Sequence, residues 1–142
     1  METETILITG ALGQIGSELA EKLKTIYGKN NVIISDIRDP KEVDYDGIYE
    51  VIDVLDANRI KEVIAQYNVK TVYHLAALLS GTAEKNPMFG WKLNMDTLLT
   101  FLELAKDNVI DKIFWPSSIG VFGPDTPKEQ TPQNTIQTPS TV

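Results

Sequence analysis

Three glycines spaced three residues apart are the residues whose types and spacing point most directly to chemistry. Gly10, Gly13 and Gly16 stand between the apolar run Ile6–Ile8 and a segment whose apolar residues recur at helical spacing. The first glycine permits a tight turn, the second lets the backbone approach phosphates, and the third lets the helix pack closely on the strand. The start of that helix offers free N–H groups to an anion. The pattern predicts a turn that holds a pyrophosphate, and it excludes a P-loop because Ser17 follows where that motif has lysine.

An acidic residue follows the second predicted strand, 20 residues after Gly16. At this place Asp36 is expected to accept hydrogen bonds from the ribose hydroxyls of a dinucleotide. A negative charge there favours NAD over NADP, although Arg38 could neutralise a 2′-phosphate. A solvated turn residue or a helix cap is the alternative for Asp36.

Two further strand ends carry candidate cofactor contacts. Asp53 is expected to accept from the adenine amino group while Val54 offers its backbone N–H, and the alternative is that Asp53 caps the next helix. Ala76 and Ala77 are small enough to let the chain pass close to the cofactor, which ordinary packing would explain equally well. The single histidine, His74, is interpreted as a partly buried strand residue rather than as a catalyst.

A pair of serines closes the fifth predicted strand. The hydroxyl of Ser118, after Ser117, would lie near the nicotinamide end of a dinucleotide and could exchange a proton with a substrate hydroxyl under oxidation. A structural alternative is that it caps the turn that Gly120 implies. Asn94 is, by its position alone, a polar residue on a helix face.

Alternating strand and helix patterns must position these residues. Because its apolar runs are nearly continuous, the sheet is expected to be parallel, which predicts an α/β, Rossmann-type doubly wound fold, present as its N-terminal portion only. A Rossmann domain over 1–123 and a Pro/Thr-rich loop or extended tail over 124–142 are expected. The strands are expected near 5–9, 31–35, 48–53, 70–75 and 112–117, and the helices near 13–27, 56–67 and 86–106.

Composition excludes several classes of function. The net charge of −7 argues against a nucleic-acid or anionic-membrane surface, and no apolar run approaches the roughly 20 residues of a membrane span. The absence of cysteine and the single histidine exclude disulfides, thiolate catalysis and the usual metal sites, so no metal is expected. Because the first residues, Met1–Glu4, are acidic, no signal peptide is expected and the cytoplasm is the expected location.

Taken together, these segments resemble the extended short-chain dehydrogenases/reductases, which include NAD-dependent nucleotide-sugar epimerases and dehydratases. The resemblance covers essentially the whole chain, from the glycine turn through His74–Ala77 to the segment 117–123. It implies NAD as cofactor and Ser118 as a catalytic residue that orients the substrate hydroxyl. The cofactor-binding residues that it implies are Gly10, Leu12, Gly13, Gln14, Ile15, Gly16, Asp36, Ile37, Arg38, Asp53, Val54, Leu75, Ala76, Ala77, Asn94, Pro116 and Ser117.

Within this family, the segments 78–87 and 115–119 are most similar to the short-chain L-threonine 3-dehydrogenases. This resemblance implies oxidation of the threonine hydroxyl to 2-amino-3-oxobutyrate with reduction of NAD. It also implies that Ser80, Gly81, Thr82 and Ser118 bind the amino acid, although the first three read as a simple loop from the sequence alone. The resemblance also implies a homodimer of the full-length enzyme through the long helix, and core packing is the alternative explanation for the leucines of that helix.

The family's general base, a tyrosine with a lysine four residues later, has no counterpart among the tyrosines of this chain. The pair is expected directly after Val142, so we expect the chain to be a fragment that is inactive alone. A nucleotide-sugar epimerase or dehydratase is the alternative within the family. A non-catalytic dinucleotide-binding module is the alternative outside enzymes.

Overall fold

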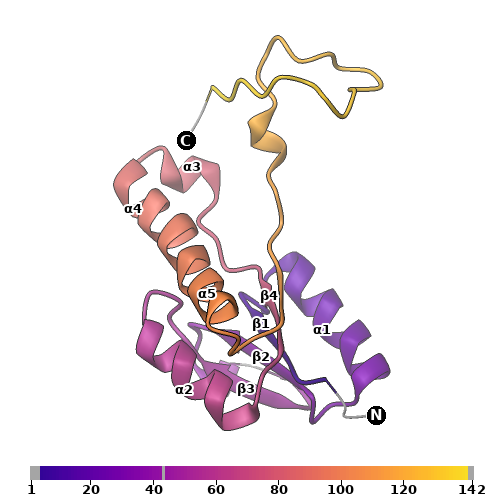
Figure 1. Ribbon diagram of the computed structural model, residues 1–142, viewed down its shortest axis with the longest axis vertical. Coiled ribbons are helices and arrows are strands. Elements are labelled where there is room, and N and C mark those ends of the chain that lie inside the picture. The colour runs from indigo at the N-terminus through magenta and orange to yellow at the C-terminus, as the bar shows by residue number, and fades with distance from the viewer. Residues whose placement is uncertain (1–3, 43, 141–142) are drawn as a thin grey trace.

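The fold is a parallel sheet covered by helices on its two faces (Figure 1). A computed structural model describes residues 4–42 and 44–140, so most of the acidic start Met1–Glu4 lies outside the described residues, as do Val43, Thr141 and Val142. The strand order β3-β2-β1-β4-β5 confirms the predicted Rossmann-type fold. The strands are β1 (Ile6–Thr9), β2 (Val32–Asp36), β3 (Ile48–Val51), β4 (Thr71–His74) and β5 (Lys112–Phe114).

Strand β1 lies at the centre of the sheet and sets its register. Leu7 lies opposite Ile33 of β2 on one side and Val72 of β4 on the other, and Thr9 pairs with His74. The side chains of β1 are fully buried because both neighbours and both faces are covered. The carboxyl ends of β1, β2 and β4 therefore meet at one edge of the sheet.

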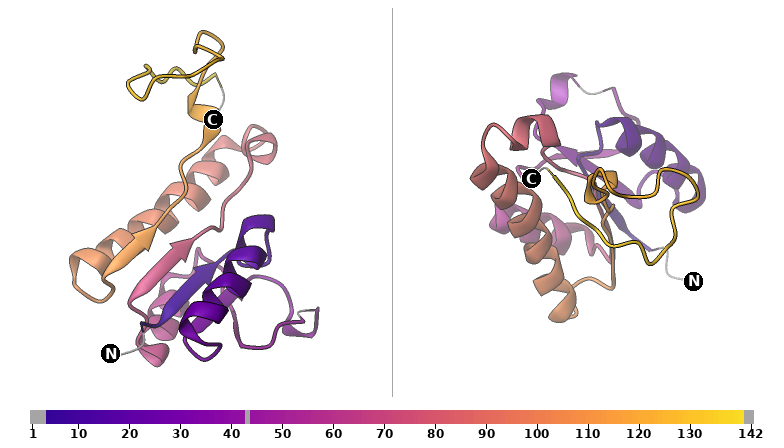
Figure 2. Two further views of the ribbon diagram at one scale, coloured as in Figure 1. Left: turned by 90° about the vertical axis from the view of Figure 1, so that its right-hand side faces the viewer. Right: turned by 90° about the horizontal axis from the view of Figure 1, so that it is seen from above.

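The two faces of the sheet carry different helices. Helix α1 (Gln14–Tyr27) packs on one face, and α2 (Ala57–Tyr67) and α5 (Thr97–Lys106) pack on the other (Figures 1 and 2). Alternate strand residues point to the two faces, which divides the buried side chains into two clusters. The α1 side contains Ile6, Ile8, Ala11, Ala20, Leu23, Val32 and Ile34, and the opposite side contains Leu7, Ile33, Ile52, Ile60, Val63, Ile64, Val69, Val72, Phe101, Leu104 and Ile110.

The helix expected over 86–106 is interrupted. It consists of α4 (Pro87–Trp91), a π-helical turn η2 (Lys92–Asp96) and α5, and the side chain of its N-cap, Asn86, accepts from the N–H of Phe89. The expectation of a loop at residues 80–82 is wrong, because Ser80–Ala83 forms a short helix, α3. Two 3-10 turns, η1 (Pro40–Glu42) and η3 (Ile119–Val121), complete the elements.

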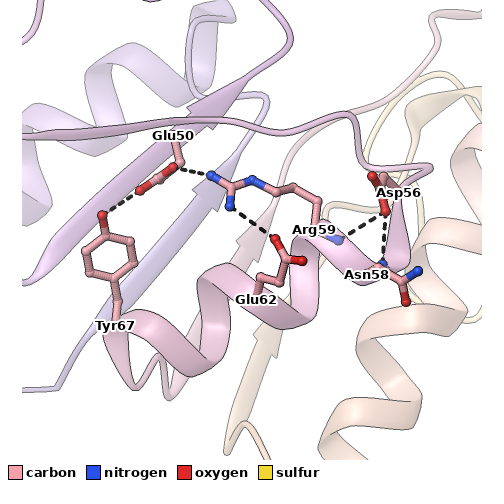
Figure 3. Close-up of polar contacts among 6 residues, drawn as sticks. All are labelled: Glu50, Asp56, Asn58, Arg59, Glu62 and Tyr67. Atoms are coloured by element: carbon pink, nitrogen blue, oxygen red, sulfur yellow. Dashed lines mark hydrogen bonds and ion pairs between the residues drawn. The ribbon is translucent and has the colours of Figure 1, made fainter.

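A polar network fixes α2 to the edge strand β3 (Figure 3). The carboxylate of Glu50 accepts from Arg59 Nη2 and from Tyr67 Oη, each at 2.5 Å, and Arg59 also reaches Glu62 at 3.4 Å. The carboxylate raises the pKa of the Tyr67 phenol because it accepts the proton that ionisation would remove. This network joins β3 to both ends of α2, through Arg59 near the start of the helix and Tyr67 at its last residue.

Candidate functional site

The glycine turn after β1 is built so that two of its glycines admit no side chain. Gly10 has a φ of +65°, and a Cβ there would lie 2.6 Å from the backbone nitrogen of Ala76. A Cβ on Gly16 would lie 2.6 Å from Cα of Ala11, so this glycine lets α1 pack directly on the turn. The roles expected for these two glycines agree with this geometry.

The beginning of α1 leaves hydrogen-bond donors for an anion. Its N-cap is Gly13, which has no side chain to bond the first N–H groups, and the first turn carries no acidic residue. Gln14 and Ile15 are exposed there, and Ile15 keeps 65% of its surface although it is apolar. A phosphate fits this end of the helix by charge and by hydrogen bonding, so the residues present suit a dinucleotide.

Asp36 ends β2 and faces the glycine turn. Its Oδ2 accepts from the backbone N–H of Leu12 at 3.3 Å, and its Oδ1 accepts from that of Ile37 at 2.9 Å. Arg38 Nε lies 3.8 Å from Oδ1, and the Arg38 carbonyl accepts from Tyr49 Oη at 2.8 Å. Burial is the largest cause that raises the pKa of Tyr49, and the negative charge of Asp36 raises it further. The carboxylate is thus held on the turn, where its side chain is 13% exposed.

The segment that leaves β4 runs beside the glycine turn. Leu75 N–H donates to Thr9 O at 3.1 Å, and Ala76 touches Gly10 as described above. Further along, the side chain of Asn94 on η2 pairs with both backbone groups of Leu78, accepting at 2.7 Å and donating at 3.1 Å. Asn94 therefore fixes the segment that leaves β4, and its expected contact with the cofactor stays a prediction.

Asp53 and Val54 follow β3, where the sequence left two roles open. Asp53 Oδ1 accepts from the N–H of Leu55 at 2.9 Å, and Val54 is buried. The N-cap of α2 is Asp56, which accepts from the N–H groups of Asn58 and Arg59 (Figure 3). The alternative in which Asp53 caps this helix is therefore wrong, whereas its contact with adenine stays a prediction.

The predicted substrate-binding and catalytic residues, with Pro116 and Ser117, lie outside the group of residues formed by the glycine turn and the ends of β2, β3 and β4. Ser80, Gly81 and Thr82 form an exposed helical turn, α3, just beyond the β4 exit. Pro116, Ser117 and Ser118 are exposed in the segment that leaves β5 and projects away from the sheet (Figures 1 and 2). Ser118 Oγ accepts from the N–H of Gly120 at 3.1 Å, which is the turn-capping role that the sequence also allowed.

Sequence reasoning missed three residues at this edge of the sheet. Thr9, Leu78 and Thr97 hold the strand ends and the π-helical turn together through His74 and Asn94. The sequence signal that could have identified Thr97 is the presence of a threonine among the apolar residues of the predicted helix. His74 itself is fully buried, so its assignment as partly buried is wrong. Within residues 4–42 and 44–140, no cluster of three potential metal ligands occurs and no helix is long and apolar enough to cross a membrane.

Comparison with known proteins places this arrangement in a family. The profile described as the NAD dependent epimerase/dehydratase family matches residues 6–141. An uncharacterized epimerase/dehydratase of Staphylococcus saprophyticus is 51% identical over 139 residues, which are 96% of this chain and 43% of that protein. The structure of L-threonine dehydrogenase from Clostridium difficile has 50% identity and a TM-score of 0.89, covering 99% of this chain and 44% of the other.

A GalE-like L-threonine dehydrogenase from Cupriavidus necator, in its holo form, has 45% identity and a TM-score of 0.89. The match covers 96% of this chain and 45% of that protein. The chain thus spans less than half the length of each of these relatives.

Proposed function

Because this chain belongs to the NAD-dependent epimerase/dehydratase family, we propose that it is the cofactor-binding part of an L-threonine 3-dehydrogenase. Such an enzyme oxidises the side-chain hydroxyl of L-threonine to 2-amino-3-oxobutyrate. The observation that carries the proposal is the 50% identity with the Clostridium difficile L-threonine dehydrogenase over 99% of this chain. NAD is the cofactor of the family, in agreement with the cofactor expected from the sequence.

The cofactor is proposed to lie across the strand ends. The backbone of Gly10–Gly16 and the start of α1 would hold the pyrophosphate, since their N–H groups lack a capping side chain. Asp36 would accept from the adenosine ribose, and Asp53 with Val54 would meet adenine. The other proposed contacts are Ile37, Arg38, Leu75, Ala76, Ala77, Asn94, Pro116 and Ser117.

The substrate is proposed to bind where α3 follows the β4 exit. Ser80, Gly81 and Thr82 are exposed on α3, and the Asn94–Leu78 pairing fixes the chain that leads to them. Ser118 would orient the hydroxyl of threonine, whose proton leaves to a general base as the carbon gives up hydride. NAD supplies the hydride acceptor when it is bound.

The proposal is tested with the protein at the length of its relatives. We expect L-threonine to reduce NAD, measured by NADH absorbance, and UDP-glucose to remain unconverted in a parallel assay. Ser118→Ala is expected to lower kcat by about 10²-fold or more, because orientation and proton transfer are both weakened, whereas Ser118→Thr keeps the hydroxyl and should retain most of it. Conversion of UDP-sugars without oxidation of threonine would show a nucleotide-sugar enzyme instead.

The 142 residues alone are proposed to bind NAD without turning over threonine. None of their five tyrosines is followed by lysine four residues later, so they lack the family's proton-transfer pair. Turnover by the purified 142-residue chain at a rate typical of enzymes would contradict this. A homodimer of the longer enzyme and a cytoplasmic location both stay predictions.

A further inference from the structure

His74 joins two buried threonines from different elements. Its Nδ1 lies 2.7 Å from Thr9 Oγ1 on β1, and its Nε2 lies 2.8 Å from Thr97 Oγ1 at the start of α5. All three residues are at most 1% exposed. A buried polar group without a partner costs free energy, and here each group has its partner only while the three elements keep their present spacing.

The hydrogen bonds of this chain have one direction. Thr97 Oγ1 lies 2.5 Å from the carbonyl oxygen of Leu93, and a carbonyl can only accept, so the Thr97 hydroxyl donates its proton there. Thr97 must then accept from Nε2–H of His74. The opposite nitrogen, Nδ1, carries no proton in the neutral ring and accepts from Thr9 Oγ1. A backbone carbonyl at one end therefore selects a single tautomer of His74.

The surroundings of the ring keep it neutral. Its neighbours are the two hydroxyl groups and the ring of Phe101, whose centroid lies 4.9 Å away. Burial lowers the pKa of His74 to about 4, and burial is the one cause of this shift. A proton on Nδ1 would also remove the acceptor that Thr9 uses.

Both ends of this chain of hydrogen bonds lie at the cofactor site. Thr9 is followed by Gly10, and the ring is followed by the Leu75–Ala77 segment, which touches Gly10. Thr97 closes η2, the turn that also carries Asn94 and its bonds to Leu78. A displacement of the ring would break its hydrogen bond to Thr9 or to Thr97, unless the segment that carries that threonine moved with it.

We propose that His74 is a positioning residue for NAD, which holds the glycine turn and the π-helical turn at a fixed separation through one neutral tautomer. It does so without touching the cofactor. The inference depends on the family's cofactor and not on the identity of the substrate. A histidine that serves packing alone would stabilise the fold equally well, and the two roles differ in what the hydroxyl of Thr97 contributes.

A pair of variants at Thr97 separates these roles in the protein at its natural length. Thr97→Val keeps the shape and removes the hydroxyl, whereas Thr97→Ser keeps the hydroxyl. We expect Thr97→Val to weaken NAD binding about tenfold, measured by isothermal titration calorimetry, and Thr97→Ser to bind within about twofold of the parent. Leu104→Ala, in the same helix and the same buried cluster, is the packing control, which should lower the melting temperature and leave the affinity for NAD unchanged.

The tautomer provides a second measurement, which does not depend on a Thr97 variant that folds. Nitrogen NMR of the ring, with the His74 signals identified by their absence in His74→Gln, should show a proton on Nε2 and none on Nδ1. Saturation with NAD should slow exchange of that Nε2 proton with water. A proton on Nδ1, unchanged exchange, or a Thr97→Val protein that binds NAD like the parent would each overturn the proposal.

Discussion

Acidification is expected to destabilise this fold, and the contribution of His74 by itself should be large enough to measure. In the folded chain its pKa is about 4, against an ordinary value of 6.5, because burial disfavours the charged ring. Between these two pH values the unfolded chain binds a proton that the folded chain does not. The free energy of unfolding therefore falls as pH falls through this range, and the loss levels off below about pH 4.

The size of the effect follows from the gap between the two pKa values. At about 1.36 kcal/mol per pH unit, the contribution of His74 to stability should shrink by about 3 kcal/mol between pH 7 and pH 4. This is a large share of the roughly 5–15 kcal/mol that stabilises an ordinary domain. The ring is 1% exposed, so solvent screens little of it.

Urea denaturation of the parent and of His74→Gln at a series of pH values isolates this contribution. The aspartates and glutamates titrate in both proteins, so their effects cancel in the difference between the two free energies of unfolding. We expect that difference to narrow in favour of the variant by about 3 kcal/mol on going from pH 7 to pH 4. A constant difference, or an NMR titration of His74 with a pKa near 6.5, would refute the reasoning.

Three further substitutions test other contacts. Gly16→Ala places a methyl group 2.6 Å from the backbone of the preceding turn and should lower the free energy of unfolding, measured by urea denaturation, by about 1–3 kcal/mol. Gly81→Ala is the control, because a Cβ there would have nothing within 4 Å. Equal stability of the two variants would contradict the packing argument. The Glu50 side chain is 15% exposed, and Glu50→Gln should lower the free energy of unfolding by about 1–3 kcal/mol. The Glu62 side chain is 65% exposed, and Glu62→Gln should lower it by about 0.5 kcal/mol or less. Thermal melts that rank the two variants in the opposite order would show that the network does not stabilise the fold. Asp36→Asn should weaken NAD binding about tenfold or more while narrowing the preference over NADP, and calorimetry with both cofactors that finds an unchanged ratio would exclude Asp36 as its source.

The fold was predictable because its determinants are local. The apolar run Ile6–Ile8 and the glycines after it specify a strand, a turn and a helix within one short segment, and the structure confirms each of them. The cap at Asn86 was predictable for the same reason. Its side chain bonds the first turn of the helix that begins at the next residue, so the residues that form the cap are adjacent in the sequence.

Features that depend on distant partners were not predictable. Asn94 in the π-helical turn bonds Leu78, and Thr97 directly after the turn bonds His74. Because both partners come from another part of the chain, the sequence of the helix alone indicates a regular α-helix. The Glu50–Arg59 contact likewise forms only once β3 and α2 have packed. Helix α3 was missed because Gly81 and Thr82 are poor helix formers.

The central position of β1 also has a consequence for the order in which the chain acquires its shape during synthesis. Thr9 pairs with His74, and Gly10 packs against Ala76, so the turn after β1 lacks these contacts until the residues through Ala76 have been made. Closing so long a loop costs entropy before its contacts reward it, which makes such pairings slow. On the ribosome, β1 is made before its partner β4 and is therefore completed late, and until then this apolar strand depends on other protection from aggregation.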